Sequence, residues 1–237
     1  MPAGGGCVLN ATLPLARLRS VMAAHPLRAV LEQVHPDSCP SILNFHCHTT
    51  YSDGSLRPEA LGEQALAIGL SHLAVTDHHS TLAFEPLQRW FLAQADAGLT
   101  VPTLWSGVEI SCLLDSCLVH VLALGFEPGH SSLDPYRQGQ APVGELLQAR
   151  EVVSRIHEAG GLAVLAHPGR YRLNFQRLIP AAAALGFDGA EAYYDYELQP
   201  RWQPTPVVCD AIAKLLDDHA LLRSCGTDTH GLQLCGR

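Results

Sequence analysis

Short apolar runs alternate with longer amphipathic stretches from residue 41 onward. Runs rich in Val, Ile, Leu and aromatic residues predict strands over 42–48, 72–77, 103–110, 118–125, 161–166, 188–193 and 221–226. Helical spacing of apolar residues predicts helices between them, including one from Pro58 and others around 146–156 and 208–215. This alternation is typical of βα units that build a largely parallel sheet.

The predicted strands indicate an α/β fold. Seven strands are about one short of a full eight-stranded barrel, so we expect a closed or nearly closed barrel, with a doubly wound open sheet as the alternative. The short link between 103–110 and 118–125 suggests a hairpin. Residues 1–40, Gly-rich at first and then broken by prolines, are interpreted as an N-terminal arm, and residues 41–237 as the barrel.

The first predicted strand runs into a loop rich in residues that bind metals. Because side chains alternate along a strand, His46 and His48 project from the same face and can reach one ion. Asp53 follows in a Ser-Asp-Gly turn that can fold back over the strand end. Taken alone, however, a His-x-His pattern is a weak signal.

Similar side chains stand at or near the ends of most other predicted strands. They are His78, Glu109, His120, His167, Asp228 and His230. Singly, a histidine after an apolar run is more often a hydrogen-bonded core residue than a ligand, and a lone Glu or Asp there is consistent with a helix cap. Jointly, so many ionisable groups at one end of a barrel would be costly to bury unless cations bind them. Histidines and carboxylates without thiolates suit Zn, Mn or Fe, whereas Ca prefers an all-oxygen shell.

Composition narrows the class of protein. The 237 residues are 47% hydrophobic and carry a formal charge of −8, which disfavours stable binding of duplex nucleic acid. Inward carboxylates neutralised by cations would, however, leave the surface less acidic. The eight cysteines form no CxxC pair and are expected to be small buried hydrophobes. No apolar stretch of about 18 residues occurs, and arginines interrupt the N-terminal apolar residues, so we expect a cytoplasmic protein without membrane contact.

Four further polar residues are candidates for roles beside the predicted ligands. Arg170 and Arg172 follow His167, and their planar guanidinium groups suit phosphate. His79 is interpreted as a residue at the rim of the pocket, and Asp77 as an acceptor for an imidazole N–H or as a turn residue. Near the strand ends, aromatic residues are candidates for stacking on a base, with packing as the alternative: Tyr171, Tyr193, Tyr194 and Trp202.

Together these motifs resemble the PHP (polymerase and histidinol phosphatase) family of metal-dependent phosphoesterases. The matching segments are His46-Cys47-His48, Ser52-Asp53-Gly54, Thr76-Asp77-His78, Gly107-Val108-Glu109, His120, Ala166-His167-Pro168 and Gly226-Thr227-Asp228-Thr229-His230. They span residues 44–231 in the order of the family. The resemblance implies a distorted (β/α)7 TIM-like barrel, which agrees with the seven strands predicted from the pattern.

The resemblance also implies a trinuclear site with two to three divalent ions of Mn, Zn or Fe. His46, His48, Glu109 and Asp228 would hold the first metal, and Glu109 would bridge to a second held by His120 and His167. Asp53, His78 and His230 would hold the third. Asp at position 53 is similar to the stand-alone nucleotide and oligonucleotide phosphoesterases of the family rather than to the histidinol phosphatase branch.

The expected reaction is hydrolysis of a phosphate ester by a hydroxide that the metal ions activate. His79, Arg170 and Arg172 would steady the leaving oxygen or position the phosphate. The expected substrate is a small phosphorylated molecule, such as a nucleotide or a short oligonucleotide end. Two alternatives remain. One is an amidohydrolase-like metal hydrolase of other substrates, although no lysine stands near a strand end where it could be carbamylated, since the single lysine, Lys214, lies in a helical pattern. The other is a non-catalytic metal-binding regulatory module.

Overall fold

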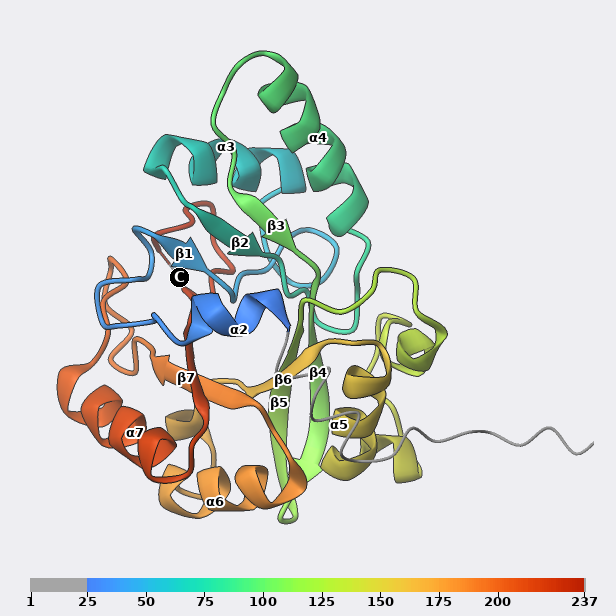
Figure 1. Cartoon of the computed structure of the whole chain (residues 1–237), viewed down its shortest axis with the longest axis vertical. Helices are drawn as coiled ribbons and strands as arrows, with labels where there is room; N and C mark the ends of the chain where they lie inside the picture. Colours follow the sequence, from blue (N-terminus) through green and yellow to red (C-terminus); the bar gives the residue numbers. More distant parts are fainter. Residues whose placement is uncertain (1–24, 237) are drawn as a thin grey trace, which may run out of the picture.

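A computed structural model describes residues 25–236 of the chain (Figure 1). Most of the predicted N-terminal arm, residues 1–24, lies outside the described residues. The rest of it, residues 25–40, does not stand apart from the remainder of the fold. Helix α2 (Pro26–Leu31) places Leu27 and Leu31 in the main hydrophobic core, at 0% and 1% exposure. Because these apolar side chains are buried, residues 25–40 belong to the packed body of the protein.

Three short parallel strands form the first sheet, in the order β1 (Leu43–Asn44), β2 (His72–Ala74) and β3 (Thr103–Trp105). Helices α3 (Pro58–Ile68) and α4 (Phe84–Asp96) pack together beside this sheet, at the top of Figure 1. Leu61, Leu87 and Phe91 turn inward from them and form a second hydrophobic cluster. Pro58 stands in the first turn of α3, as the sequence predicts, and Gly69 ends the helix in a left-handed conformation.

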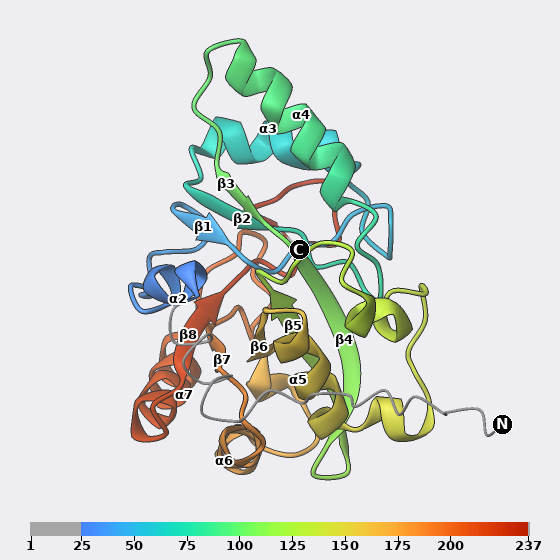
Figure 2. The ribbon, with the colours of Figure 1, turned by 45° about the vertical axis from the view of Figure 1, so that its right-hand side comes forward.

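Five strands form the second sheet, in the order β4 (Gly107–Leu114), β5 (Cys117–Leu124), β6 (Leu162–Leu165), β7 (Gly189–Tyr193) and β8 (Leu222–Cys225). The β4–β5 pair is antiparallel, which confirms the predicted hairpin, and β6, β7 and β8 run parallel. Helices α5 (Ala149–Glu158), α6 (Phe175–Leu185) and α7 (Pro206–Asp218) lie along the outside of this sheet (Figures 1 and 2). Three short 3-10 turns are η1 (Ser131–Tyr136), η2 (Gly144–Leu147) and η3 (Pro168–Arg170).

The predicted strand 103–110 is divided into β3 and β4, which belong to different sheets. The break falls where the chain passes close over the end of β2: a Cβ on Gly107 would lie 2.5 Å from the carbonyl oxygen of Val75. The two sheets are nevertheless linked. The Phe45 N–H donates to the carbonyl of Cys225 at 3.1 Å, and an isolated parallel bridge pairs His78 with Glu109. The result is an α/β fold in which eight described strands make two linked sheets.

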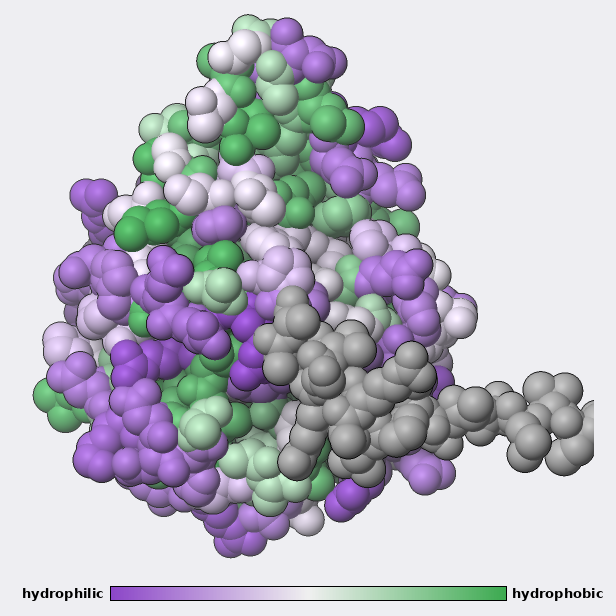
Figure 3. Space-filling view, in the orientation of Figure 1, coloured by the Kyte–Doolittle hydropathy of each residue, from purple (hydrophilic) through white to green (hydrophobic). Residues whose placement is uncertain are grey.

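The outer surface is uneven in polarity. Leu92 and Leu99, near the end of α4, are 60% and 52% exposed, and Figure 3 shows hydrophobic residues gathered over this part of the molecule. Six cysteines are buried and unpaired, as the sequence predicts: Cys39, Cys47, Cys112, Cys117, Cys209 and Cys225. Within residues 25–236, no helix has both the length and the apolar character that a membrane crossing needs.

Candidate metal centre

One pocket of about 390 Å³ opens at the carboxyl ends of the parallel strands. Its lining includes seven of the nine predicted ligands, and the other two, His46 and His48, are buried beside Glu109 and Asp228. The lining residues are Asp53, His78, Glu109, His120, His167, Arg170, Asp228 and His230. All nine predicted ligands therefore meet in one place, although they come from distant parts of the sequence.

Four buried side chains form the innermost group: His46, His48, Glu109 and Asp228. The Nε2 atoms of His46 and His48 lie 3.0 and 3.1 Å from Oε2 of Glu109. The same two nitrogens lie 3.3 and 3.2 Å from Oδ1 of Asp228. Two imidazole nitrogens and two carboxylate oxygens thus converge on one point, as a divalent ion of the Zn or Mn type requires.

Glu109 connects this group to a second one. Its other oxygen, Oε1, lies 2.8 Å from His120 Nδ1 and 3.3 Å from His167 Nε2. The side chain is 1% exposed, and both of its oxygens are held by imidazoles from different strands. The two oxygens of a single carboxylate therefore face two separate groups, which is the arrangement expected of a bridging ligand.

A third group lies closer to solvent. His230 Nε2 and His78 Nε2 are 3.4 and 3.8 Å from Oδ2 of Asp53, and His48 Nδ1 is 3.6 Å from its Oδ1. The Asp53 side chain is 55% exposed, whereas that of His78 is 27% exposed. This group is more accessible than the other two and can exchange its occupant more readily.

Unsatisfied buried atoms show that cations fit these groups. Both ring nitrogens of His48 and Nδ1 of His167 are buried without a hydrogen-bond partner among the described residues, and carboxylate oxygens lie 3.1–3.6 Å from the two nitrogens of His48. Leaving such atoms unpaired costs about 1–3 kcal/mol each. Arg170 is the one basic side chain other than histidine in the lining of the pocket. The donor set therefore lacks enough positive charge of its own, and divalent ions would supply it.

Burial and charge shift the pKa values of these groups in opposite directions. Burial opposes protonation of His46, but the carboxylates of Glu191, Glu109 and Asp228 outweigh it and raise the pKa well above its ordinary value. The pKa of His48 is raised to about 9 against the same burial, through the nearby carboxylates of Asp228 and Glu109. Burial lowers the pKa of His78 to about 4. His78 is therefore neutral near pH 7, whereas His46 and His48 must lose a proton to bind a metal.

The backbone is strained where it delivers two of the ligands. Asp228 and His167 have φ values of +51° and +27°, a region that non-glycine residues rarely occupy. Gly226 lies directly against His46, since a Cβ there would be 2.3 Å from the Cβ and the N of His46. Strain of this kind costs about 1–3 kcal/mol per residue and concentrates at functional sites.

Asp77 supports the loop that carries Asp53. It is fully buried, and its carboxylate accepts hydrogen bonds from the Thr49 N–H (2.6 Å), the Thr49 hydroxyl (2.6 Å) and the Ser52 hydroxyl (2.7 Å). The sequence suggested that Asp77 is an acceptor for an imidazole N–H or a simple turn residue. Its carboxylate takes neither role and instead accepts from Thr49 and Ser52. Its role is to fix residues 49–52, so that Asp53 faces His78 and His230.

The structure does not bring two of the predicted catalytic residues into the pocket. The His79 ring is turned away, with Nε2 accepting the Ser111 N–H at 3.2 Å and Nδ1 lying 3.3 Å from the carbonyl of Tyr136. Its φ of +49° sends the side chain behind β4 instead of toward the rim. Arg172 is exposed and does not line the pocket. Arg170 does line it, and its guanidinium bonds Asp228 Oδ2 at 3.0 Å and the Tyr194 hydroxyl at 2.9 Å.

The aromatic residues considered for base stacking are mostly packed inside the protein. Tyr193, Tyr194 and Trp202 are 3%, 1% and 5% exposed. Tyr171 is partly buried, and its hydroxyl accepts the His120 N–H at 2.8 Å. These rings therefore support the ligands and the core. For the three buried rings, Tyr193, Tyr194 and Trp202, the structure favours packing over stacking on a base.

One residue at the site, Glu191, was missed by the sequence analysis, and a second, Tyr194, has a different role from the one considered there. Glu191 lies in the buried strand β7, and its Oε2 contacts the His46 ring and the His167 N–H. Tyr194, just after β7, donates its hydroxyl proton to Asp228. The signal for Glu191 was a single carboxylate in an otherwise apolar strand, Gly-Ala-Glu-Ala-Tyr.

Comparison with known proteins identifies the family and several relatives that this chain resembles. The family model of the PHP domain matches residues 44–159, which confirms the resemblance predicted from the motifs. A relative from Escherichia coli K12, 5'-3' exoribonuclease Rnm, is 25% identical over 80% of this chain and 85% of its own length. A 3',5'-nucleoside bisphosphate phosphatase from Chromobacterium violaceum is 26% identical over 79% of this chain and 87% of its own.

A solved structure shares the fold. It belongs to a Bifidobacterium adolescentis protein whose assignment as a metal-dependent phosphoesterase is itself an inference. The TM-score is 0.64 at 21% identity, and the match covers 81% of this chain and 88% of the other.

Proposed function

We propose that this chain, which carries a PHP domain, hydrolyses phosphate esters of nucleotides or of short oligonucleotide ends with the help of two to three divalent metal ions. The observation that carries the proposal is the convergence of nine metal-competent side chains in and beneath one pocket. We also interpret the two linked sheets as a distorted (β/α)7 barrel, because the first and last strands are joined by backbone hydrogen bonds.

The proposed assignment of ligands follows the three groups. His46, His48, Glu109 and Asp228 would hold the first ion, and Glu109 with His120 and His167 the second. Asp53, His78 and His230 would hold the third. Bound divalent ions would polarise the phosphoryl oxygens and lower the pKa of water toward neutrality, which supplies the hydroxide for hydrolysis.

The side chains of the protein prepare the pocket for this chemistry. Arg170 points one guanidinium nitrogen at Asp228 and Tyr194, which fixes its orientation, and its side chain is still 42% exposed. The remaining N–H groups of a planar guanidinium suit two phosphate oxygens. Tyr194 and Arg170 both bond Oδ2 of Asp228, which leaves Oδ1 directed at His46 and His48. Arg170 would therefore orient both a ligand and the phosphate.

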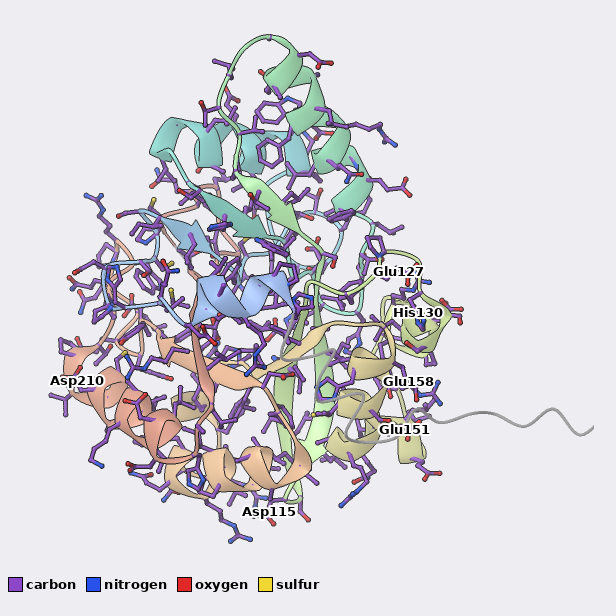
Figure 4. The ribbon with its side chains drawn as sticks, viewed as in Figure 1. Asp115, Glu127, His130, Glu151, Glu158 and Asp210 are labelled. Atoms are coloured by element: carbon purple, nitrogen blue, oxygen red, sulfur yellow. The ribbon has the colours of Figure 1, made fainter. Side chains whose placement is uncertain are left out.

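The substrate class is proposed from the charge distribution and from the relatives. Acidic residues lie around the outside of the molecule on several elements, among them Asp115, Glu127, Glu158 and Asp210, all exposed (Figure 4). Such a surface repels a long phosphate backbone, because nonspecific affinity depends on basic side chains. The two curated relatives are named for activity on RNA and on a nucleoside bisphosphate. A substrate that offers one or two phosphates at an end fits both facts.

The test combines elemental analysis with activity. Purified protein, prepared without chelator, is analysed for transition metals and then assayed with p-nitrophenyl phosphate, a 3',5'-nucleoside bisphosphate and a 5'-phosphorylated RNA oligonucleotide in added Mn²⁺. Two to three ions per chain with release of phosphate or nucleotide would support the proposal. Bound metal without turnover on any phosphoester would contradict it and redirect the search to amide and lactone substrates. Absence of bound metal after reconstitution would contradict the metal centre itself.

A further inference from the structure

Glu191 is a buried carboxylate that the ligand set does not include. It lies in the middle of β7, whose five residues are all buried, and it is itself 0% exposed. No Lys or Arg forms an ion pair with it among the described residues, and its one ion pair is with His46. A charge in such a place is costly unless its surroundings compensate it. Its retention therefore points to a role at the neighbouring centre.

One oxygen of Glu191 contacts two of the proposed ligands. Oε2 lies 3.0 Å from Nδ1 of His46 and 2.7 Å from the backbone nitrogen of His167. A carboxylate can only accept, so the His46 Nδ1–H donates to it, and the other nitrogen, Nε2, is left facing Glu109 and Asp228. A carboxylate behind a ligating imidazole fixes the tautomer and the ring orientation and strengthens the ligand.

The bond to His167 acts on the backbone. His167 follows β6 and begins η3 at a φ of +27°, where a non-glycine residue is strained. The acceptor on Glu191 holds this N–H in place, which directs His167 Nε2 toward Oε1 of Glu109 at 3.3 Å. His46 belongs to the first proposed metal group and His167 to the second, so a single oxygen supports both.

We propose that Glu191 is the positioning residue that sets the geometry of His46 and His167 together, and thereby couples the first two metal positions. The inference rests on the proposed function for its metal centre. It predicts that a change at Glu191 weakens both positions at once, whereas loss of a ligand of one group would weaken that group first. The carboxylate charge, and not only its shape, is needed, because it makes His46 a stronger ligand.

The test uses the near-isosteric variant Glu191→Gln in the full chain, with Asp188→Asn as a matched control. Asp188 directly precedes the same strand but bonds Arg28, His157 and the Ala163 N–H, away from the pocket. Binding of Mn²⁺ and Co²⁺ to chelator-treated protein is measured by titration, with the visible spectrum of Co²⁺ as a second readout. Circular dichroism and melting of the metal-free proteins show whether each variant folds.

We expect Glu191→Gln to fold, to lose about 10- to 100-fold in affinity at the first two positions and to change the Co²⁺ spectrum. Asp188→Asn should melt lower but bind Mn²⁺ within about twofold of the parent protein, because its partners lie away from the centre. Parent-like affinity and spectrum in a folded Glu191→Gln would overturn the proposal, as would an equal loss of affinity in Asp188→Asn. If the parent binds metal but hydrolyses no phosphoester, the proposed function fails while this binding result still decides the role of Glu191.

Discussion

Removing the carboxylate of Asp77 should lower both the stability of the protein and its binding of the third metal ion. Asp77 accepts three short hydrogen bonds, two of them from Thr49, which is fully buried, and one from Ser52, which is partly exposed. In Asp77→Ala these donors lose their acceptor. Water can reach the Ser52 hydroxyl, but it cannot reach the Thr49 N–H without opening the loop.

The magnitude follows from these partners. Hydrogen bonds to a charged group contribute about 1.5–3 kcal/mol each, and a buried donor left unpaired costs about 1–3 kcal/mol. Because Ser52 can be solvated, the two bonds from Thr49 dominate, and we expect a loss of about 3–5 kcal/mol in the free energy of unfolding. Asp77→Asn should cost less, about 1–2 kcal/mol, since an amide can still accept the Thr49 N–H and donate to its hydroxyl.

The assay is urea unfolding of the metal-free proteins, together with the number of Mn²⁺ ions bound per chain. Asp53→Asn serves as the control, because the Asp53 side chain is 55% exposed and faces only the third metal group. It should bind about one ion fewer while unfolding at nearly the parental urea concentration. Asp77→Ala should lose both stability and the third ion. Parental stability in Asp77→Ala would refute the idea that this carboxylate fixes the loop.

Three further outcomes are expected. His167→Ala should reduce turnover by about 10³-fold or more and lower the metal content, because it removes a ligand of the second group; full activity at full metal content would exclude His167 as a ligand. In chelator, the metal-free protein should lose stability as the pH rises from about 6.5 through 9, because the raised pKa of His48 gives stability only while the ring is protonated. Excess Mn²⁺ should remove this loss of stability, and melting temperatures measured across this pH range with and without metal test both statements. Arg170→Gln should raise KM for a phosphate ester about tenfold. Arg172 is exposed and lies outside the pocket, so the control variant Arg172→Gln should keep a KM near the parental value, and equal effects of the two variants would contradict the role of Arg170.

The convergence of the candidate ligands was predictable because each of them stands where the local pattern changes. His46 and His48 end an apolar run, and His167 and Asp228 follow one, so the rule that parallel strands deliver side chains to one edge places them together. The hairpin was predictable for a similar reason, since its link is short. These features depend on residues that are neighbours in sequence.

The features that sequence reasoning missed depend on contacts across long separations or on backbone torsion. Asp77 bonds Thr49 and Ser52, and nothing in the local pattern shows that these hydroxyls point at it. His79 follows the ligand His78 directly, but its positive φ turns the ring to Ser111. Glu191 stands as one polar residue in a buried strand, and only the tertiary packing brings its carboxylate to the His46 ring.

The charge of the pocket reconciles an acidic protein with a phosphate substrate. Glu109, Glu191, Asp228 and Asp53 bring four carboxylates to the site, and Arg170 is the non-histidine cation that lines it. Without metal this balance is negative and repels phosphate. Two to three divalent ions would reverse the sign locally, while the acidic outer surface stays unchanged. Affinity for phosphate would then be confined to the pocket and conditional on its metals, which favours a phosphorylated end over a long charged backbone.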